Sequence, residues 1–299
     1  MNQNVRSSIH LYKDFVAEVI KNAAMGNAAV RRLRSRRPRA GVVFTGRSEE
    51  IERYAFGGLR LLQEFGVDIN ERSICEIGPG DYLTSGLSLL AAGASHYAVI
   101  DRFPGDYSGE LAKRWYRGIY DGWSKAFPRS DWPDWLNVAG FPENLTDRVE
   151  IIRKPIEAIE TENRFDIVCS FQVGEHVSDI DAFAAANVKL LKKPGGLALH
   201  RVDFGPHGPW GTYADPMTFL RFSDRTWTLT GSNRGVPNRR RHHEFLDAFH
   251  GAGLEVETVL FEKFDANRVD LSKLHSRFRS MPRESLMTQT AIYRLELKS

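Results

Sequence analysis

The sequence predicts an α/β protein in which helices cover a doubly wound, mostly parallel sheet of seven strands. Three observations lead to this prediction. Short apolar runs alternate with longer segments whose apolar residues recur at helical spacing. The first clear run, residues 73–77, breaks into a turn with two glycines, as a buried parallel strand does before its crossover helix. At 299 residues and 42% hydrophobic, the chain is long enough for one such domain with additions.

Composition excludes several functional classes. The formal net charge of +3 is small for this length and predicts no general affinity for polyanions. No run of about 18 apolar residues is present to span a membrane, and residues 1–40 lack the apolar centre of a secretion signal. The two cysteines, Cys75 and Cys169, fall within predicted buried strands, so no disulfide is expected. We therefore expect a soluble, cytoplasmic protein.

The first 66 residues are expected to form a helical extension or lid. Helical spacing of apolar residues covers residues 9–33 and 49–65, and Gly66 suits the end of the second helix. Between them, the arginines from Arg31 to Arg39 form a basic run that Pro38 interrupts. This run suits an anion or nucleic-acid patch or a solvated connector, and the absence of interleaved aromatic residues favours the connector.

The glycine turn after the first strand predicts a ligand site. Gly78 and Gly80 lie between the end of strand 73–77 and a helix expected over residues 82–93, where nucleotide-like ligands bind in open α/β sheets. A dinucleotide pattern would need a third glycine where Leu83 stands. Asp101, which ends the next apolar run, has a carboxylate that suits two ribose hydroxyls.

These residues carry a family resemblance. The segment 76–80 together with Asp101 resembles motif I and the following acidic position of class I S-adenosylmethionine-dependent methyltransferases. The resemblance implies a Rossmann-like sheet and S-adenosylmethionine as the cofactor, with the glycines letting the backbone approach its amino-acid part. The residues that it assigns to cofactor binding are Glu76, Gly78, Pro79, Gly80, Asp101, Arg102, Pro155, Ile156, Ser170 and Phe171.

An aromatic-rich insertion over residues 104–148 is predicted to follow the second strand. It holds four of the six tryptophans, and a helix over residues 109–126 would place Trp115, Ile119 and Trp123 on one side. Two interpretations remain open, packing of these rings against the sheet and lining of an acceptor pocket as a substrate cap. Residues 67–299, with this insertion, are expected to form the methyltransferase domain.

The third and fourth strands are predicted at residues 149–152 and 165–170, and a turn that begins at residue 190 leads into the fifth, which ends at residue 203. Segments 166–177 and 190–200 resemble the fourth strand with its loop and the fifth strand of the same family, so the resemblance covers residues 73–203. One departure concerns the adenine site, because residues 153–156 lack the acid that many relatives place there. Backbone groups near Pro155 and Ile156, or the side chains of Glu157 and Glu160, are the alternatives.

Three histidines stand where this fold would place an active site. If the acceptor is an alcohol, in-line methyl transfer needs a base as well as alignment. His207 is the first choice, because it lies in a loop rich in glycine and proline after the fifth strand. His176 and His200 are further candidates, and Asp203 lies on the opposite strand face from His200 by alternation.

No metal ion is expected. Residues 172–176 partly resemble the Glu-x-x-Glu-His loop by which some ubiquinone-pathway O-methyltransferases hold a divalent ion, but Gln172 replaces the first acid. The loss of an anionic oxygen ligand disfavours a hard cation such as Mg²⁺. A structural or cofactor-lining role is therefore expected for Glu175 and His176.

The carboxyl-terminal third more loosely resembles bacterial methyltransferases that act on sugars or polysaccharide precursors. A helix over residues 244–253 and strands at 254–261 and 290–295 are predicted. Arg239, Arg240 and Arg241 precede the helix and suit either a phosphate or carboxylate of the acceptor or a solvated helix start.

The leading hypothesis is an O-methyltransferase for a small molecule or glycan. N-methylation of a small amine is the alternative within enzymes. Two other classes are a nucleic-acid-binding methyltransferase-like protein and a non-catalytic partner subunit, but the tetrapeptide that grips a base amine is absent after the fourth strand, where residues 171–174 read Phe-Gln-Val-Gly. Nucleic acid is thus an unexpected partner. The acceptor atom and the oligomeric state, with a homodimer as one option, stay open.

Overall fold

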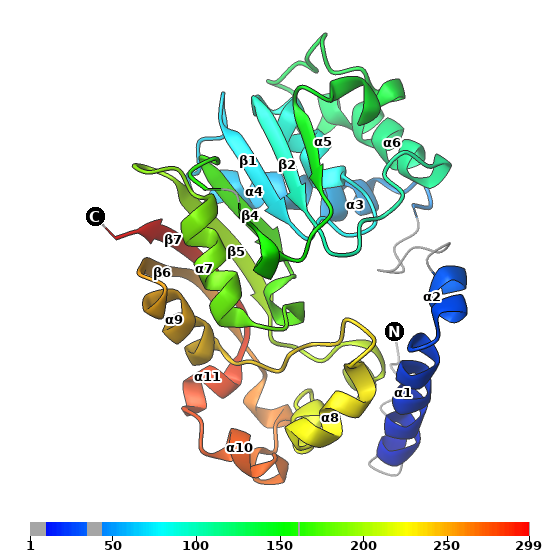
Figure 1. Ribbon diagram of the computed structural model, residues 1–299, viewed down its shortest axis with the longest axis vertical. Coiled ribbons are helices and arrows are strands. Elements are labelled where there is room, and N and C mark those ends of the chain that lie inside the picture. Colours follow the sequence, from blue (N-terminus) through cyan, green and yellow to red (C-terminus); the bar gives the residue numbers. More distant parts are fainter. Residues whose placement is uncertain (1–9, 35–43, 161, 299) are drawn as a thin grey trace.

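The computed structural model describes residues 10–34, 44–160 and 162–298, and within them a single seven-stranded sheet has the order β3-β2-β1-β4-β5-β7-β6 (Figure 1). The strands are β1 (Ser73–Ile77), β2 (His96–Ile100), β3 (Val149–Ile152), β4 (Ile167–Phe171), β5 (Leu197–Asp203), β6 (Leu254–Lys263) and β7 (Thr288–Leu297). In this sheet β7 runs opposite to the other six strands and pairs antiparallel with both β5 and β6. The predicted fold class is confirmed, and the last strand lies between β5 and β6 rather than at an edge.

Helices cover both faces of the sheet because its central strands are apolar on both sides. The helices α4 (Gly57–Glu64), α5 (Thr84–Ala91) and α6 (Glu110–Ala126) pack over the face that includes Ile74 and Val99. On the other face, α7 (Ile180–Leu190) and α9 (His242–Gly251) cover Cys75 and Val168. Both cysteines are buried and unpaired. In the described part of the chain, no helix has the length and apolar character needed to cross a membrane.

The predicted amino-terminal helices are present but interrupted. The first is divided into α1 (Leu11–Met25) and α2 (Ala28–Arg34) at Gly26 and Asn27. The second runs through α3 (Ser48–Ile51), a π-helical turn (Glu52–Phe56) and α4. Helix α1 packs on α8 (Asp224–Gly231), where the side-chain amide of Asn22 donates to the carbonyl of Leu229 at 3.0 Å. Most of the basic run at 31–39 lies outside the residues described, and the lid role of 1–66 stays a prediction.

Helix α6 is the crossover helix between β2 and β3, and its rings are mostly core residues. The predicted helix over 109–126 is confirmed, with Trp115 and Trp123 at most 2% exposed. Tyr116 packs edge-on against Phe141 with ring centroids 4.8 Å apart. This packing favours a structural role for the inner rings of the insertion, whereas its role as a substrate cap stays a prediction.

The arginines before α9 do not form a surface patch. Arg239 is 2% exposed and Arg241 is fully buried beside a third apolar cluster that includes α8, α10 (Ser276–Arg279) and α11 (Arg283–Met287). The guanidinium group of Arg241 donates to the carbonyls of Phe204 and Thr288, each at 2.9 Å, and of Leu286 at 3.2 Å. For Arg239 and Arg241 both sequence interpretations, an acceptor grip and a solvated helix start, are therefore wrong, because these two side chains bind carbonyl groups inside the protein. Arg240, which is 43% exposed and pairs with Glu244, fits the solvated helix start.

Candidate active site

The turns that carry the predicted site residues meet at one edge of the sheet. Parallel pairing aligns Ile77 with Ile100, and Ile100 with Ile152, so β1, β2 and β3 end together. In the same way, β4 and β5 run side by side to Phe171 and Arg201. The loops after these five strands therefore lie together at the carboxyl edge of the sheet, the edge where ligands bind in doubly wound folds.

The glycine turn has a backbone shape that only glycine adopts without strain. Gly78 and Gly80 have φ angles of +67° and +81°. The amide of Gly78 donates to the carbonyl of Ile100 at 2.9 Å, which fixes the turn against β2. A Cβ atom on Gly78 would lie 2.8 Å from both γ carbons of Val173, in the loop after β4. The turn is thus pressed against the next loop with no room for a side chain.

Glu76 is a buried acid directly before this turn. Its side chain is on the face of β1 that packs against Tyr97, whose hydroxyl donates to the carboxyl group. Burial raises the pKa of Glu76 to about 7, and the nearby charge of Asp101 adds to this effect. A cationic ligand group at the turn would stabilise the ionised form of this carboxyl group and so lower its pKa.

Asp101 directly follows β2 and opens a tight turn. Its amide donates to the carbonyl of Ile152 at 3.1 Å, and its carboxylate accepts from the amide of Phe103 at 2.6 Å. The side chain of Arg102 is exposed. Beyond β3, Pro155 leads into a short turn (Ile156–Ala158) whose first side chain is 7% exposed. The predicted cofactor residues of three successive loops thus lie at the same edge.

Ser170 and His200 form part of the core. Both side chains are fully buried, and the hydroxyl of Ser170 lies 2.8 Å from Nδ1 of His200. The other ring nitrogen, Nε2, is 2.8 Å from the side-chain oxygen of Asn187 on α7. Because that oxygen only accepts, Nε2 carries the proton and Nδ1 accepts from the serine. We therefore do not retain His200 as a base or the Ser170 hydroxyl as a cofactor contact.

The neutral ring of His200 predicts acid-sensitive stability. Burial lowers its pKa to about 3, whereas an unfolded histidine titrates near 6.5. Between these values the unfolded chain binds a proton that the folded chain excludes, so the free energy of unfolding falls as pH falls, by about 1.4 kcal/mol per pH unit. Denaturant titrations from pH 7 to pH 4 should show this slope to be shallower in His200→Gln. Equal slopes in both proteins would contradict the prediction.

Glu175, His176, Asp203 and His207 come together after β4 and β5. The rings of His176 and His207 have centroids 4.9 Å apart. Nε2 of His207 lies 3.7 Å from Oδ2 of Asp203, and the histidine side chain is 30% exposed. Burial would raise the pKa of Asp203, but His207 and the amide of Gly205 lower it. The predicted His207 and Asp203 thus form a pair that opens toward solvent.

The two neighbours of this pair are more deeply buried. Burial raises the pKa of Glu175 to about 8. Burial, together with the charge of His207, lowers the pKa of His176 to about 4. The two carboxyl oxygens of Glu175 have no hydrogen-bond partner among the described residues. The backbone amides of Glu175 itself and Asp203 lie near the carboxyl group and favour its ionised form through their N–H dipoles, although neither makes a hydrogen bond of good geometry with it.

Several residues that shape the site carry no recognisable sequence signal. Gln172 adopts a φ of +61°, an unusual conformation for a residue with a side chain. The side-chain amide of Asn238 donates to the carbonyls of Gly174 and Val177, each at 2.9 Å, and so fixes the loop after β4. Gly58 packs against the ring of Phe171, which a Cβ would approach to 2.6 Å. These contacts join segments far apart in the chain, which local patterns do not reveal.

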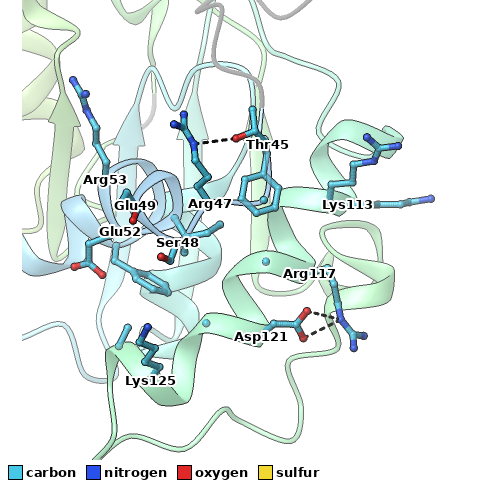
Figure 2. Close-up of a pocket in the computed structure, with 18 of the residues that line it drawn as sticks. Thr45, Arg47, Ser48, Glu49, Glu52, Arg53, Lys113, Arg117, Asp121 and Lys125 are labelled. Carbon is cyan, nitrogen blue, oxygen red and sulfur yellow. Dashed lines mark hydrogen bonds and ion pairs between the residues drawn. The ribbon is translucent and has the colours of Figure 1, made fainter. Parts of the chain in front are cut away.

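A separate groove of about 1210 Å³ lies between α3 and α6 (Figure 2). Its sides are rich in charged residues, among them Arg117 and Asp121, which form an ion pair 3.0 Å long. Arg47 at the other side donates to the hydroxyl of Thr45 at 3.1 Å. The residues that line the groove include none of the predicted cofactor or catalytic residues. It is therefore distinct from the carboxyl-edge site.

Comparison with known proteins adds a family match. A family profile described as "Methyltransferase domain" matches residues 47–259, which include the glycine turn and the loops after β2 to β5. A search of curated proteins found no match.

A comparison with solved structures found several that are similar to this chain at low sequence identity. One is an S-adenosylmethionine-dependent methyltransferase from Mesorhizobium loti, with 15% identity, a TM-score of 0.44, and coverage of 79% of this chain and 95% of that one. Another is geranyl diphosphate C-methyltransferase from Streptomyces coelicolor, with 12% identity, a TM-score of 0.47, and coverage of 87% and 88%. A third is the YcgJ protein from Bacillus subtilis, with 11% identity, a TM-score of 0.44, and coverage of 81% and 99%.

Proposed function

The chain belongs to the methyltransferase-domain family as a class I S-adenosylmethionine-dependent methyltransferase, and on that premise we propose that it methylates a hydroxyl oxygen of a small molecule or glycan. The observation that carries this proposal is the His207–Asp203 pair at the carboxyl end of β5. A partly exposed imidazole beside a carboxylate suits the removal of a proton from an alcohol.

The cofactor would occupy the glycine turn. We assign its cationic amino-acid part to the backbone of Gly78, Pro79 and Gly80, with Glu76 beneath, and its ribose hydroxyls to Asp101. Ile156 and the backbone near Pro155 would hold the adenine ring, since no acid directly follows β3. Glu157 is engaged elsewhere, because its carboxylate accepts from the hydroxyl of Ser178 at 2.7 Å. Phe171 would close the site from the end of β4.

Methyl transfer itself is a single displacement. Bound S-adenosylmethionine would supply the methyl group to the acceptor oxygen, and the electron pair of the broken carbon–sulfur bond would stay on a sulfur that becomes neutral. The hydroxyl proton passes to the ring of His207. Asp203 orients that ring and stabilises the imidazolium that forms. His176, with its ring beside His207, positions it from the loop after β4.

Replacing His207 by alanine should lower kcat roughly 10²- to 10⁴-fold, the usual worth of a positioned base. The assay would use methyl-labelled S-adenosylmethionine with hydroxylated nucleotide sugars and phenols, and with the matching amino compounds. Cofactor affinity, measured by calorimetry, should be unchanged in His207→Ala and much weaker in Asp101→Ala. His250→Ala, at an exposed position on α9, is the matched histidine control.

Two results would overturn the proposal. A kcat of His207→Ala within a few-fold of the wild type would exclude this histidine as the base. Methylation of the amino compounds alone would replace the O-methyltransferase proposal by N-methylation, because an amine needs less help from a base. Unchanged cofactor affinity in Asp101→Ala would exclude the ribose assignment but leave the transfer chemistry standing.

A further inference from the structure

We propose that Glu175, His176 and His207 bind a divalent transition-metal ion. One possible ligand atom from each of these side chains lies within 4.8 Å of the others. Glu175 and His176 belong to the short helical turn (Gly174–His176) after β4, and His207 to the loop after β5. The site therefore joins two loops at the carboxyl edge of the sheet, beside the proposed position of the acceptor.

The carboxyl group of Glu175 is the strongest sign that this site binds a cation. The residue is 2% exposed, and neither oxygen has a hydrogen-bond partner in the described part of the chain. An unpaired acid in such a place is costly, and buried charges in proteins are usually paired or bind a metal. Arg201 on β5 acts on the carboxyl group only by its charge. A cation between Glu175 and the two imidazoles would satisfy the acid directly.

The surroundings of both histidines resemble the outer shell of a metal site. Metal-bound histidines usually direct their second ring nitrogen to a carboxylate or a backbone carbonyl. Nε2 of His207 faces Asp203 at 3.7 Å, so Nδ1 is the nitrogen left for an ion. His176 lies beside the carbonyls of Gly235 and Val236. These partners would fix the ring orientations before an ion arrives.

The ligand set selects the class of ion. Two imidazoles and one carboxylate suit Zn²⁺, Co²⁺ or Fe²⁺, whereas Mg²⁺ prefers oxygen ligands throughout. Bonds of about 2.0–2.2 Å need ligand atoms roughly 3–3.5 Å apart, so rotation of the side chains must draw the three atoms together by about an ångström. A second acid at position 172 would favour a hard cation such as Mg²⁺, but this position is Gln172, which is consistent with a transition-metal ion.

The catalytic role of the ion rests on the proposed function, whereas its binding to the three side chains does not. Three protein ligands leave open positions for the acceptor oxygen. The base role proposed for His207 applies to the protein without an ion. With an ion bound to His207, the ion would lower the pKa of the acceptor hydroxyl, and the proton would pass to water. Residues 172–176 alone disfavour a metal, because they carry only part of the ligand set. The contribution of the loop after β5 was not visible in that local motif.

The test is calorimetric titration of the full chain, stripped with a chelator, with Zn²⁺, Co²⁺ and Mg²⁺ separately. We expect one Zn²⁺ or Co²⁺ ion per chain and a visible absorption band for the Co²⁺ form. Glu175→Gln and His207→Gln should each weaken binding at least about tenfold, since even outer-shell losses cost 10- to 100-fold. His250→Gln should bind as the wild type does. Circular dichroism would show that each variant is folded.

No Zn²⁺ or Co²⁺ binding, binding of Mg²⁺ alone, or equal Zn²⁺ affinity in all variants would overturn the inference. The outcomes for the two proposals are distinguishable. If the stripped protein binds no ion but still transfers methyl groups to a hydroxyl, the metal inference fails while the proposed function stands. If Zn²⁺ binds at the three residues but only amines are methylated, the proposed acceptor fails while the metal site stands.

Discussion

Replacing Gly78 by alanine is expected to abolish measurable binding of S-adenosylmethionine. The φ of +67° disfavours any residue with a Cβ by about 1–2 kcal/mol. In addition, the new Cβ would lie 2.8 Å from both γ carbons of Val173, so the turn or the loop after β4 must shift. The turn is proposed to bind the amino-acid part of the cofactor. A movement that relieves this close contact would therefore break the hydrogen bonds between the turn and the cofactor. Calorimetry with the cofactor measures the effect.

Gly66 supplies a matched control for the backbone effect. It also has a φ of +67°, but nothing lies within 4 Å of the position of a Cβ. Gly66→Ala should therefore lose about 1–2 kcal/mol of stability and keep its cofactor affinity. The double variant Gly78→Ala, Val173→Ala removes the close contact and should regain part of the affinity. Wild-type affinity in Gly78→Ala would contradict the assignment of the turn.

Replacing Arg241 by methionine is expected to lower the free energy of unfolding by about 3 kcal/mol or more. Arg241 is fully buried, and its guanidinium group donates to three backbone carbonyls. Methionine fills similar space but leaves those acceptors unpaired, and each buried unpaired acceptor costs about 1–3 kcal/mol. Burial lowers the pKa of Arg241 to about 10, so the group is still charged at neutral pH. Urea unfolding measures the difference.

The neighbouring Arg240 is the control for this change. Its side chain is 43% exposed and pairs with Glu244 in the first turn of α9. An exposed pair of this kind contributes about 0–1 kcal/mol, so Arg240→Met should unfold almost as the wild type does. A similar small effect in Arg241→Met would show that water or other donors replace the guanidinium group. Because Arg241 also binds the carbonyl of Phe204, its loss should loosen the loop that carries His207.

The sheet could be predicted from sequence because its signals are local. Most of the parallel strands are short, largely apolar runs, and the glycine turn after residues 73–77 carries its backbone requirement in its own residues. The placement of the last strand could not be predicted in the same way. Its apolar pattern fits a buried strand at any position, and only its pairing with both β5 and β6 fixes it between them.

The location of a candidate site residue could be predicted when its place after a strand was enough to locate it. The burial of its side chain could not be predicted. His207 follows a strand in a loop rich in glycine, and the structure places it beside Asp203 at the carboxyl edge. His200 lies only a few residues earlier, but both nitrogens of its ring are hydrogen-bonded in the core, to Ser170 and Asn187. A histidine in a sequence looks the same in both settings, because its partners come from distant segments. The same reason concealed the burial of Arg241.

The position of β7 also has a consequence for biosynthesis. This strand follows all the others in the chain, but it pairs with both β5 and β6 inside the sheet. Until residues 288–297 have left the ribosome, β5 has an open edge, and β6 has no neighbour to join it to the sheet. The nascent chain must therefore keep this gap from pairing with other strands during translation. Completion of the sheet is a late, long-range event rather than a stepwise extension from the first strand.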